Sequence, residues 1–309
     1  MAHVRIVVAG EALIDLAPRD GLLLPLPGGS PYNVAVGLGR LGTPTTFLGH
    51  RSTDGFGRLL ASRLEAAGVS LDATTVTDEP TTLAVVHLDD QGRASYGFYL
   101  DGTSAAGLRV EELPDLGDAI AVHLSLGAIT LDTRPAGDAF AALVSREAGR
   151  RTISLDPNVR PSVIADLAAY AARLEAVVAR CDLVKVSDED LALLHPDEPA
   201  VEVARRWVRS GPAAVVVTRG SDGAFGVTAE GDEVDVAGED VEVVDTVGAG
   251  DAFTSGLLDA LRRRGRLERD GLRDLGIGDL RDAVEAAVHV AAVTCTRPGS
   301  DPPSRAEIA

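Results

Sequence analysis

The chain has 309 residues, of which 45% are hydrophobic and 25% charged, the profile of a globular protein with a sizeable buried core. Its formal net charge of −18 argues against nucleic acid, whose phosphates require basic patches, and against anionic membrane surfaces. The N-terminal segment reads as a first strand rather than a signal peptide, and no apolar run approaches the roughly 20 residues that span a bilayer. We therefore expect a cytoplasmic protein.

Short β-branched runs alternate with amphipathic stretches along most of the chain. Near-continuous apolar strands separated by helices are typical of a parallel sheet covered on both faces. The pattern predicts a single doubly wound α/β domain over residues 1–309, with ligands bound beyond the carboxyl ends of the strands. The charged stretch Gly265–Asp279 predicts a surface connection. The predicted strands are Val4–Ala9, Thr45–Leu48, Ala119–Leu126, Thr152–Leu155, Leu183–Val186, Ala213–Thr218 and Ala224–Thr228. The predicted helices include Phe56–Ala67, Ala136–Glu147, Val163–Arg180 and Ala200–Arg209.

Two segments, at about residues 11–27 and 81–104, interrupt this alternation. The first continues the first strand through turn-rich sequence, and the second holds a strand pair around the hairpin-like turn Asp89–Gly92. Strands without an intervening helix do not easily join a parallel sheet. We therefore expect a small separate β-sheet that acts as a lid over a site at the edge of the main sheet. The alternative is an extra antiparallel edge on the main sheet.

The segment Val244–Phe253 reads VDTVGAGDAF and leads into a helical pattern. The N-terminus of a helix carries unpaired N–H groups and a partial positive charge, which together suit an anion. Gly248 and Gly250 allow close approach of the backbone, and Asp251 in the same turn could accept a proton from an attacking hydroxyl. In the alternative interpretation, Asp251 only belongs to the N-cap region of an ordinary helix.

The motif DTVGAGDAF resembles the C-terminal signature of the ribokinase-like (PfkB) family of carbohydrate kinases almost letter for letter. Further blocks are similar to family segments in order and spacing: GGSPYNVA at 28–35, DPNVR at 156–160 and VTRGSDG at 217–223. The resemblance covers essentially the whole chain. It implies the ribokinase-like α/β fold with a β-sheet lid, and phosphoryl transfer from ATP to a sugar in the presence of Mg²⁺.

The resemblance also implies roles for individual residues. Asp251 would be the catalytic base, and the backbone N–H groups of Gly248, Ala249 and Gly250 would form an anion hole. We expect contacts with the sugar from Asp15, Gly29, Asn33, Phe98 and Arg160. We expect contacts with the nucleotide from Lys185 (the only lysine), Ser187, Thr218, Gly220, Gly223 and Gly250.

Two acidic residues are expected to hold cations. Family members commonly carry Asn-x-x-Glu where this chain has Ser187-x-x-Asp190, so Asp190 would help to hold Mg²⁺ through water, or Asp188 or Glu189 would do so instead. The alternative is a helix start with Ser187 as its cap and acids in the first turn, and the two interpretations are compatible. Asp245 would bind a monovalent cation such as K⁺.

The identity of the sugar depends on smaller differences. The sequence GGSPYN together with GEALIDL and DPNVRP resembles bacterial fructokinases and 2-keto-3-deoxygluconate kinases more than ribose kinases. Members that handle acidic sugars often place an arginine after the aromatic pair of the lid, whereas here Phe98-Tyr99 is followed by Leu100-Asp101. An acid at that point disfavours a carboxylate substrate. Phe98 or Tyr99 would either stack on the sugar or pack under the lid.

The sequence thus predicts an ATP-dependent kinase that phosphorylates a primary hydroxyl of a neutral sugar, fructose first. The alternatives within this class are a 2-keto-3-deoxygluconate kinase, a ribokinase and a nucleoside kinase. An alternative of another class is a catalytically silent sensor of sugar or nucleotide, although such a protein has no need of the base Asp251. The partners would be a small-molecule sugar and ATP, with a homodimer formed through the lid as a further possibility.

Overall fold

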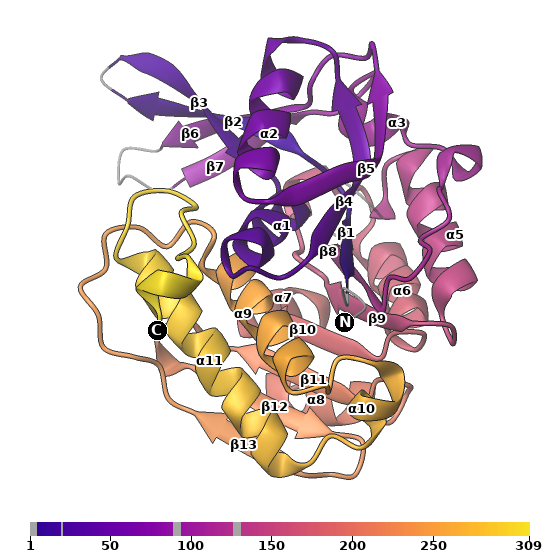
Figure 1. The fold of residues 1–309 in the computed structure, drawn as a ribbon, viewed down its shortest axis with the longest axis vertical. Coiled ribbons are helices and arrows are strands. Elements are labelled where there is room, and N and C mark those ends of the chain that lie inside the picture. Colours follow the sequence, from indigo (N-terminus) through magenta and orange to yellow (C-terminus); the bar gives the residue numbers. More distant parts are fainter. Residues whose placement is uncertain (1–4, 20, 89–93, 126–130) are drawn as a thin grey trace.

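The computed structural model describes residues 5–19, 21–88, 94–125 and 131–309 (Figure 1). Its main sheet has nine strands in the order β13-β12-β11-β10-β9-β8-β1-β4-β5. Neighbouring strands from β11 to β5 run parallel, and β12 and β13 extend the sheet with antiparallel pairing. The strands are β1 (Ile6–Ala9), β4 (Thr45–Ser52), β5 (Val69–Thr77), β8 (Ala121–Ser125), β9 (Thr152–Asp156), β10 (Leu183–Ser187), β11 (Ala214–Thr218), β12 (Ala224–Thr228) and β13 (Glu233–Val236).

Helices cover both faces of the main sheet because successive side chains of a strand point to opposite faces. In β1, Val7 and Ala9 join the apolar core under α5, α6, α7 and α8, whereas Ile6 and Val8 join the core under α1, α2, α9, α10 and α11. The predicted doubly wound α/β fold is confirmed. The helices are α1 (Ser30–Arg40), α2 (Gly55–Ala66), α3 (Ser104–Gly107), α5 (Ala136–Glu147), α6 (Leu167–Val178), α7 (Asp188–Leu194), α8 (Ala200–Val208), α9 (Ala249–Arg263), α10 (Arg269–Arg273) and α11 (Ile277–Cys295).

A second, four-stranded sheet projects from one end of the molecule, at the upper left of Figure 1. Its strand order is β3-β2-β6-β7, and β2 pairs antiparallel with β3 but parallel with β6. The predicted separate β-sheet is therefore present, and the alternative of an antiparallel edge on the main sheet is wrong. The predicted turn Asp89–Gly92 lies outside the described residues. The strands are β2 (Leu13–Arg19), β3 (Leu22–Gly28), β6 (Leu83–Leu88) and β7 (Ala94–Tyr99).

Some elements differ from the sequence prediction. The edge strand β5 was not predicted, because its side chains are mostly half-buried or exposed and its sequence lacks an apolar run. The stretch Gly265–Asp279 is not only a connection, since it contains α10, and Leu272 of that helix is buried in the core. That prediction is incomplete, because Leu267, Leu272 and Leu275 of this stretch are all buried in the core although their spacing has no recognisable helical period. Val4 and Leu126, the outer residues of two predicted strands, lie outside the described residues.

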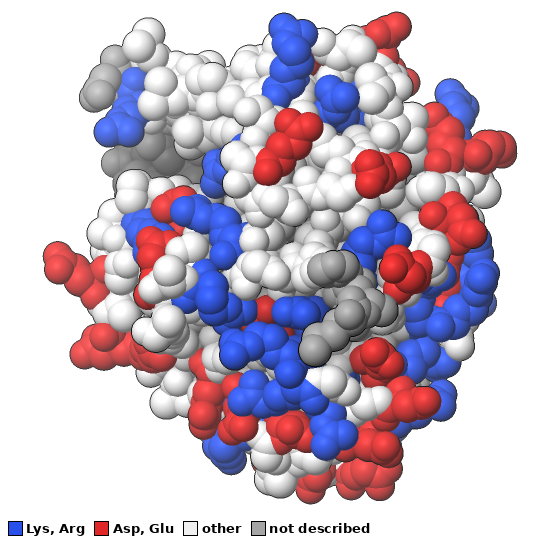
Figure 2. Space-filling model, viewed as in Figure 1, with Lys and Arg blue, Asp and Glu red and all other residues white. Residues whose placement is uncertain are grey.

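The surface carries both signs of charge despite the formal net charge of −18. On the face drawn in Figure 2, basic side chains are bordered by acidic ones. Ion pairs such as Arg264–Asp282 and Arg266–Asp279, with N–O distances of 3.0 and 2.7 Å, account for this arrangement. Much of the positive charge is thus locally compensated.

The close packing of α1 against α9 depends on Gly37. A Cβ atom at this position would lie 2.5 Å from Oγ and 2.8 Å from Cβ of Ser255 on α9. Both helices contribute to the cleft described below, because α1 begins with Ser30 and the first turn of α9 contains Asp251. The distance between the two helices therefore fixes the relative position of these two residues.

We expect Gly37→Ala to destabilise the protein by about 1–3 kcal/mol, the usual cost of adding a methyl group to a closed contact. Any activity that depends on the relative position of Ser30 and Asp251 should fall as well, since α1 is pushed away from α9. Urea unfolding and initial rates measure the two effects. A suitable control is Gly278→Ala, because Gly278 is exposed on α11 with no atom within 4 Å of the added Cβ. Equal stability of the two variants would contradict this account of the α1–α9 contact.

Candidate active site

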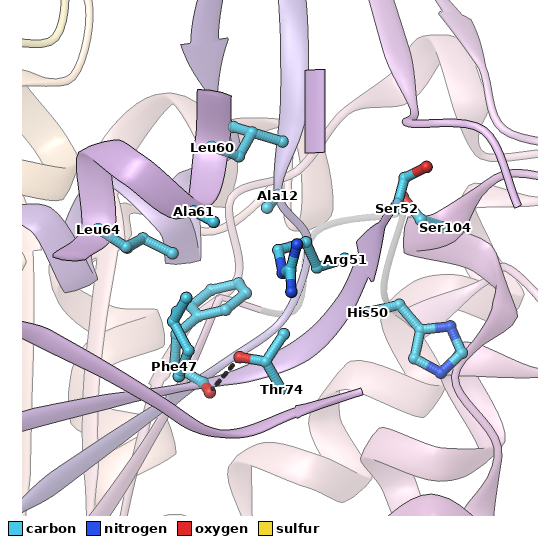
Figure 3. Close-up of a pocket in the computed structure, with 11 residues that line it drawn as sticks. Ala12, Phe47, His50, Arg51, Ser52, Leu60, Ala61, Leu64, Thr74 and Ser104 are labelled. Atoms are coloured by element: carbon cyan, nitrogen blue, oxygen red, sulfur yellow. Dashed lines mark hydrogen bonds between the residues drawn. The ribbon is translucent and has the colours of Figure 1, made fainter. Parts of the chain in front are cut away.

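A small pocket between β4 and α2 is too small to be the active site. It is lined by Phe47, Leu60 and Leu64, with the side chain of Arg51 beside them (Figure 3). Thr74 donates a hydrogen bond to the carbonyl oxygen of Phe47 at 3.0 Å. The volume of about 10 Å³ suffices for at most one water molecule. A sugar or nucleotide must therefore bind elsewhere.

A much larger cleft, of about 1130 Å³, is lined by residues of both sheets. In the main sheet the strand order reverses at β1, with β4 and β5 on one side and β8 to β11 on the other. Ligands of open α/β sheets bind beyond the carboxyl ends of the strands at such a point. Every residue predicted to act in catalysis or to bind sugar or nucleotide lines this cleft, as does Asp190, whereas Asp245 does not.

The predicted glycine turn forms the N-terminus of α9. Gly248 is the N-cap residue and has a φ of 78°, a left-handed conformation that glycine adopts without strain. The N–H group of Ala249 donates to the carbonyl oxygen of Thr246 at 3.2 Å. The N–H groups of Gly250 and Asp251 belong to the first helical turn, where no carbonyl four residues earlier accepts them. These N–H groups form the positive end of the helix dipole, and they suit an anionic ligand.

The side chain of Lys185 adds a full positive charge to this turn. A Cβ atom at Gly250 would lie 3.2 Å from Nζ of Lys185, so the glycine leaves room for the ammonium group. Nζ donates to Oδ2 of Asp156 at 3.0 Å, and both side chains are almost completely buried. Asp156 thus fixes the lysine between β9 and β10, beside the N-terminus of α9.

The carboxylate of Asp251 accepts hydrogen bonds at both oxygens. Ser30 donates its hydroxyl to Oδ1 at 2.7 Å, and Asn33 donates its amide to Oδ2 at 2.9 Å. Desolvation by the surrounding protein raises the pKa of Asp251 from 3.8 to about 6, although the two hydrogen bonds lower it. A carboxylate with a pKa of about 6 is largely ionised at neutral pH and can still take up a proton, as a general base must.

The end of the cleft near the second sheet is acidic. Burial raises the pKa of Asp15 to about 6 and that of Glu11 to about 7, while the positive charge of Arg160 lowers both. The side chain of Glu11 is buried, and its Oε2 atom has no hydrogen-bond partner. Phe98 lines the cleft and stacks on Tyr96 with ring centroids 6.1 Å apart. This end offers acceptors, one cation and an aromatic surface, which suits a polyol.

The opposite end of the cleft lies at the ends of β10 and β11. Ser187 is the N-cap of α7 and accepts a hydrogen bond from the backbone N–H of Asp190 at 3.0 Å, so the predicted helix start is present. Thr218 is the last residue of β11. Gly223 has a φ of 91°, and a Cβ atom there would lie 2.0 Å from the carbonyl oxygen of Val236. A glycine at this position lets two loops meet beside the cleft.

Several acidic residues in or near the cleft are candidates for contact with a cation. In the described part of the chain, no group of three or more histidine, cysteine, aspartate or glutamate residues could hold a metal ion. Asp190 is buried, accepts from the N–H of Val159 at 3.2 Å, and has a pKa raised by burial to about 6. Asp245 accepts from the N–H groups of Val247 and Gly299. A single carboxylate such as Asp190 is enough for Mg²⁺ that is bound mainly by phosphate and water, and Asp188 and Glu189 also line the cleft.

Three residues that contribute to the site were not assigned roles from the sequence. They are Glu11, Ser30 and Asp156, and each lies within a segment that carries the family resemblance. Their importance arises from contacts with residues far away in the chain. Local sequence patterns do not report such contacts.

Comparison with known proteins identifies the family. The model of the family described as "pfkB family carbohydrate kinase" matches residues 5–307 of this chain. A fructokinase of Rhizobium leguminosarum bv. trifolii is 41% identical over 282 residues, which cover 90% of this chain and 86% of that relative. A crystal structure of fructokinase with bound ATP from Xylella fastidiosa has a TM-score of 0.90 at 28% identity, covering 99% of this chain and 97% of that one. A fructokinase double mutant from Vibrio cholerae O395, with fructose, ADP and potassium ion bound, has a TM-score of 0.86 at 28% identity and the same coverage.

The fold and the cleft define a phosphotransferase that acts on a sugar hydroxyl. The chain belongs to the pfkB family of carbohydrate kinases, and it is similar to the fructokinases of that family. The predicted family membership is confirmed. In the described residues, no helix is both long enough and apolar enough to cross a membrane.

We expect Lys185→Met to destabilise the protein by about 3–5 kcal/mol, because Asp156 then remains buried without its charged partner. Urea unfolding at pH 7.5 measures this loss. The matched control is the double variant Lys185→Met/Asp156→Asn, which removes both charges and should regain part of the stability. A loss below about 1 kcal/mol in the single variant, typical of an exposed pair, would contradict the buried pairing.

Proposed function

We propose that this protein transfers the γ-phosphoryl group of MgATP to a primary hydroxyl of a neutral sugar, and that fructose is its substrate. The observation that carries the proposal is the position of Asp251. It lies in the glycine turn, between the acidic end of the cleft and the end formed by β10 and β11. A base at the boundary between a polyol site and an anion site is the requirement of phosphoryl transfer.

The residues suggest a direct in-line transfer. The sugar is held by Asp15, the backbone at Gly29, Asn33 and Arg160, with one hydroxyl beside Asp251. That hydroxyl attacks the γ-phosphorus as its proton passes to the carboxylate, and ADP leaves with the electron pair of the broken bond. The N–H groups of the glycine turn and the ammonium group of Lys185 stabilise the charge on the transferred group.

Two cations complete the proposal. Mg²⁺ bound to ATP would neutralise phosphate charge, and Asp190 would bind its water shell, with Asp188 and Glu189 of the same cleft as alternatives. K⁺ would bind near Asp245, whose loop is joined to Gly299 by a hydrogen bond of 2.8 Å. A fructokinase structure with potassium ion bound supports the second assignment.

The charges at the sugar end favour a neutral substrate. Glu11 and Asp15 both interact with the positive charge of Arg160, and the negative charge of Asp251 acts on each of them. A carboxylate or phosphate on the sugar would add a negative charge to this group and would be repelled. This distribution supports fructose over 2-keto-3-deoxygluconate, and the fructokinase relatives support it independently. The presence of a base argues against a silent sensor.

The test is ADP release with MgATP and a panel of acceptors. The panel contains fructose, ribose, 2-keto-3-deoxygluconate, fructose 6-phosphate, adenosine and no sugar, and we expect turnover with fructose. Asp251→Asn should lower the rate about 10²–10⁴-fold, since it removes the general base. Asp72→Asn, an exposed aspartate on β5, is the control and should leave the rate unchanged.

Each outcome of the panel is informative. Turnover with a different neutral sugar would overturn the choice of fructose but not the chemistry. A fully active Asp251→Asn variant would exclude this residue as the base. ATP binding without ADP release for any acceptor would favour the sensor.

We also propose that two copies of the chain pair through the second sheet, and that the protein acts in the cytoplasm. Leu22 and Leu26 of β3 are exposed by 67% and 45%. They lie on the same face of the strand, and exposed apolar side chains gathered on one face are typical of a binding surface. The net charge of −18 and the locally paired arginines argue against nucleic acid and membranes as partners.

The double variant Leu22→Asp/Leu26→Asp should halve the molar mass measured by light scattering, because two charges would enter the apolar contact. The two leucines are four residues apart and lie on the same face of β3, with Leu24 between them. Val110→Asp replaces another exposed apolar residue outside the sheet and should leave the mass unchanged. A monomeric wild-type protein at assay concentration would overturn the proposal.

A further inference from the structure

The hydroxyl of Ser30 bridges the first helix of the chain and the proposed catalytic base. Ser30 and Asp251 are 221 positions apart in the sequence, and their Oγ and Oδ1 atoms are 2.7 Å apart. Ser30 is 8% exposed and Asn33, which binds the other carboxylate oxygen, is 9% exposed. Two buried donors therefore hold the carboxylate, one at each oxygen.

The start of α1 leaves the hydroxyl of Ser30 free for this contact. Serine near a helix start often caps the backbone. Here the N-cap residue is Gly29, with a φ of 104°, and Ser30 is already the first helical residue, followed by Pro31. No side-chain cap hydrogen bond forms at this helix. The side chain of Ser30 instead leaves α1 and donates to α9.

We infer that Ser30 is a positioning residue for the reaction, because its hydroxyl fixes the orientation of the Asp251 carboxylate and holds it in the ionised, proton-accepting form. The inference rests on the proposed role of Asp251 as the base. A carboxylate bound at both oxygens cannot rotate without breaking both hydrogen bonds. With Asn33 alone, it would rotate about the remaining bond, and its free oxygen would lose a charge-assisted donor.

The other charged groups around Asp251 do not replace this donor. Glu11 and Asp15 face it from the second-sheet side and Asp156 from β9, and each of these negative charges opposes its ionisation. Lys185 favours ionisation, but its Nζ atom is already bonded to Asp156 at 3.0 Å. Ser30 and Asn33 are the side chains whose hydrogen bonds stabilise the charged form directly. Loss of Ser30 should therefore shift the balance toward the protonated acid.

The test is the pH profile of kcat/KM for the sugar, from pH 5 to 9 with saturating MgATP. Ser30→Ala should move the acidic limb upward by about one pH unit, the effect of losing one hydrogen bond to a charged group. At pH 6 the rate should fall about fivefold or more, because the ionised fraction of the base drops from about one half to about one tenth, and part of the loss should be recovered above pH 8. The KM for ATP should not change, since Ser30 acts on the base.

Ser255→Ala is the matched control. Ser255 is also a buried serine between α1 and α9, but its hydroxyl donates to the carbonyl oxygen of Ala252 and does not reach the cleft. Its removal should leave the acidic limb in place even if thermal stability falls. Ser30→Cys keeps a weak donor of similar size, so its limb should lie between those of wild type and Ser30→Ala. This variant also carries the test if the alanine variant does not fold.

An acidic limb that stays in place in both Ser30 variants would overturn the inference. A uniform loss of rate at every pH, matched by Ser255→Ala, would also overturn it, because the serine would then be only a packing residue. Failure of the base assignment itself is distinguishable. In that case Asp251→Asn would remain active whatever the Ser30 variants do.

Discussion

The structure of the site depends on one long-range contact, the hydrogen bonds from the start of α1 to Asp251 at the start of α9. Helix α1 follows β3 of the second sheet, and α9 carries the glycine turn. The contact therefore brings the polyol end of the cleft against the anion site. Gly37 permits it by letting the two helices approach along their length. The sheets, by contrast, supply only the frame on which these two helix ends meet.

The glycine turn was predictable from the sequence because its physics is local. A left-handed glycine, a second glycine and an acid in one helical turn specify an anion site within a few residues. The second sheet was predictable for a similar reason, since its strands follow one another without a helix. The edge strand β5 and the helix α10 were not, because each is anchored by few buried side chains and its pattern is weak.

The partners of individual side chains could not be predicted at all. Ser30 lies in a recognisable block, but nothing in that block indicates that its hydroxyl binds a carboxylate 221 positions later. The same holds for Lys185, whose partner Asp156 comes from the neighbouring strand β9. Such pairs depend on strand order and on the relative positions of helices, and these are properties of the completed fold. The sequence motif identifies the residues of the site, whereas the contacts between them depend on the topology of the fold.

The buried acids of the cleft lower the folding stability of the protein at neutral pH. Glu11, Asp15, Asp190 and Asp251 have pKa values raised by burial to about 6 or 7. Each therefore binds a proton more tightly in the folded than in the unfolded chain, so its contribution to stability falls as pH rises from about 4 to about 7. At neutral pH the folded chain holds these acids largely in their ionised form, although burial favours the protonated form. Ligands that donate hydrogen bonds to these carboxylates offset that penalty, so their binding should stabilise the folded protein.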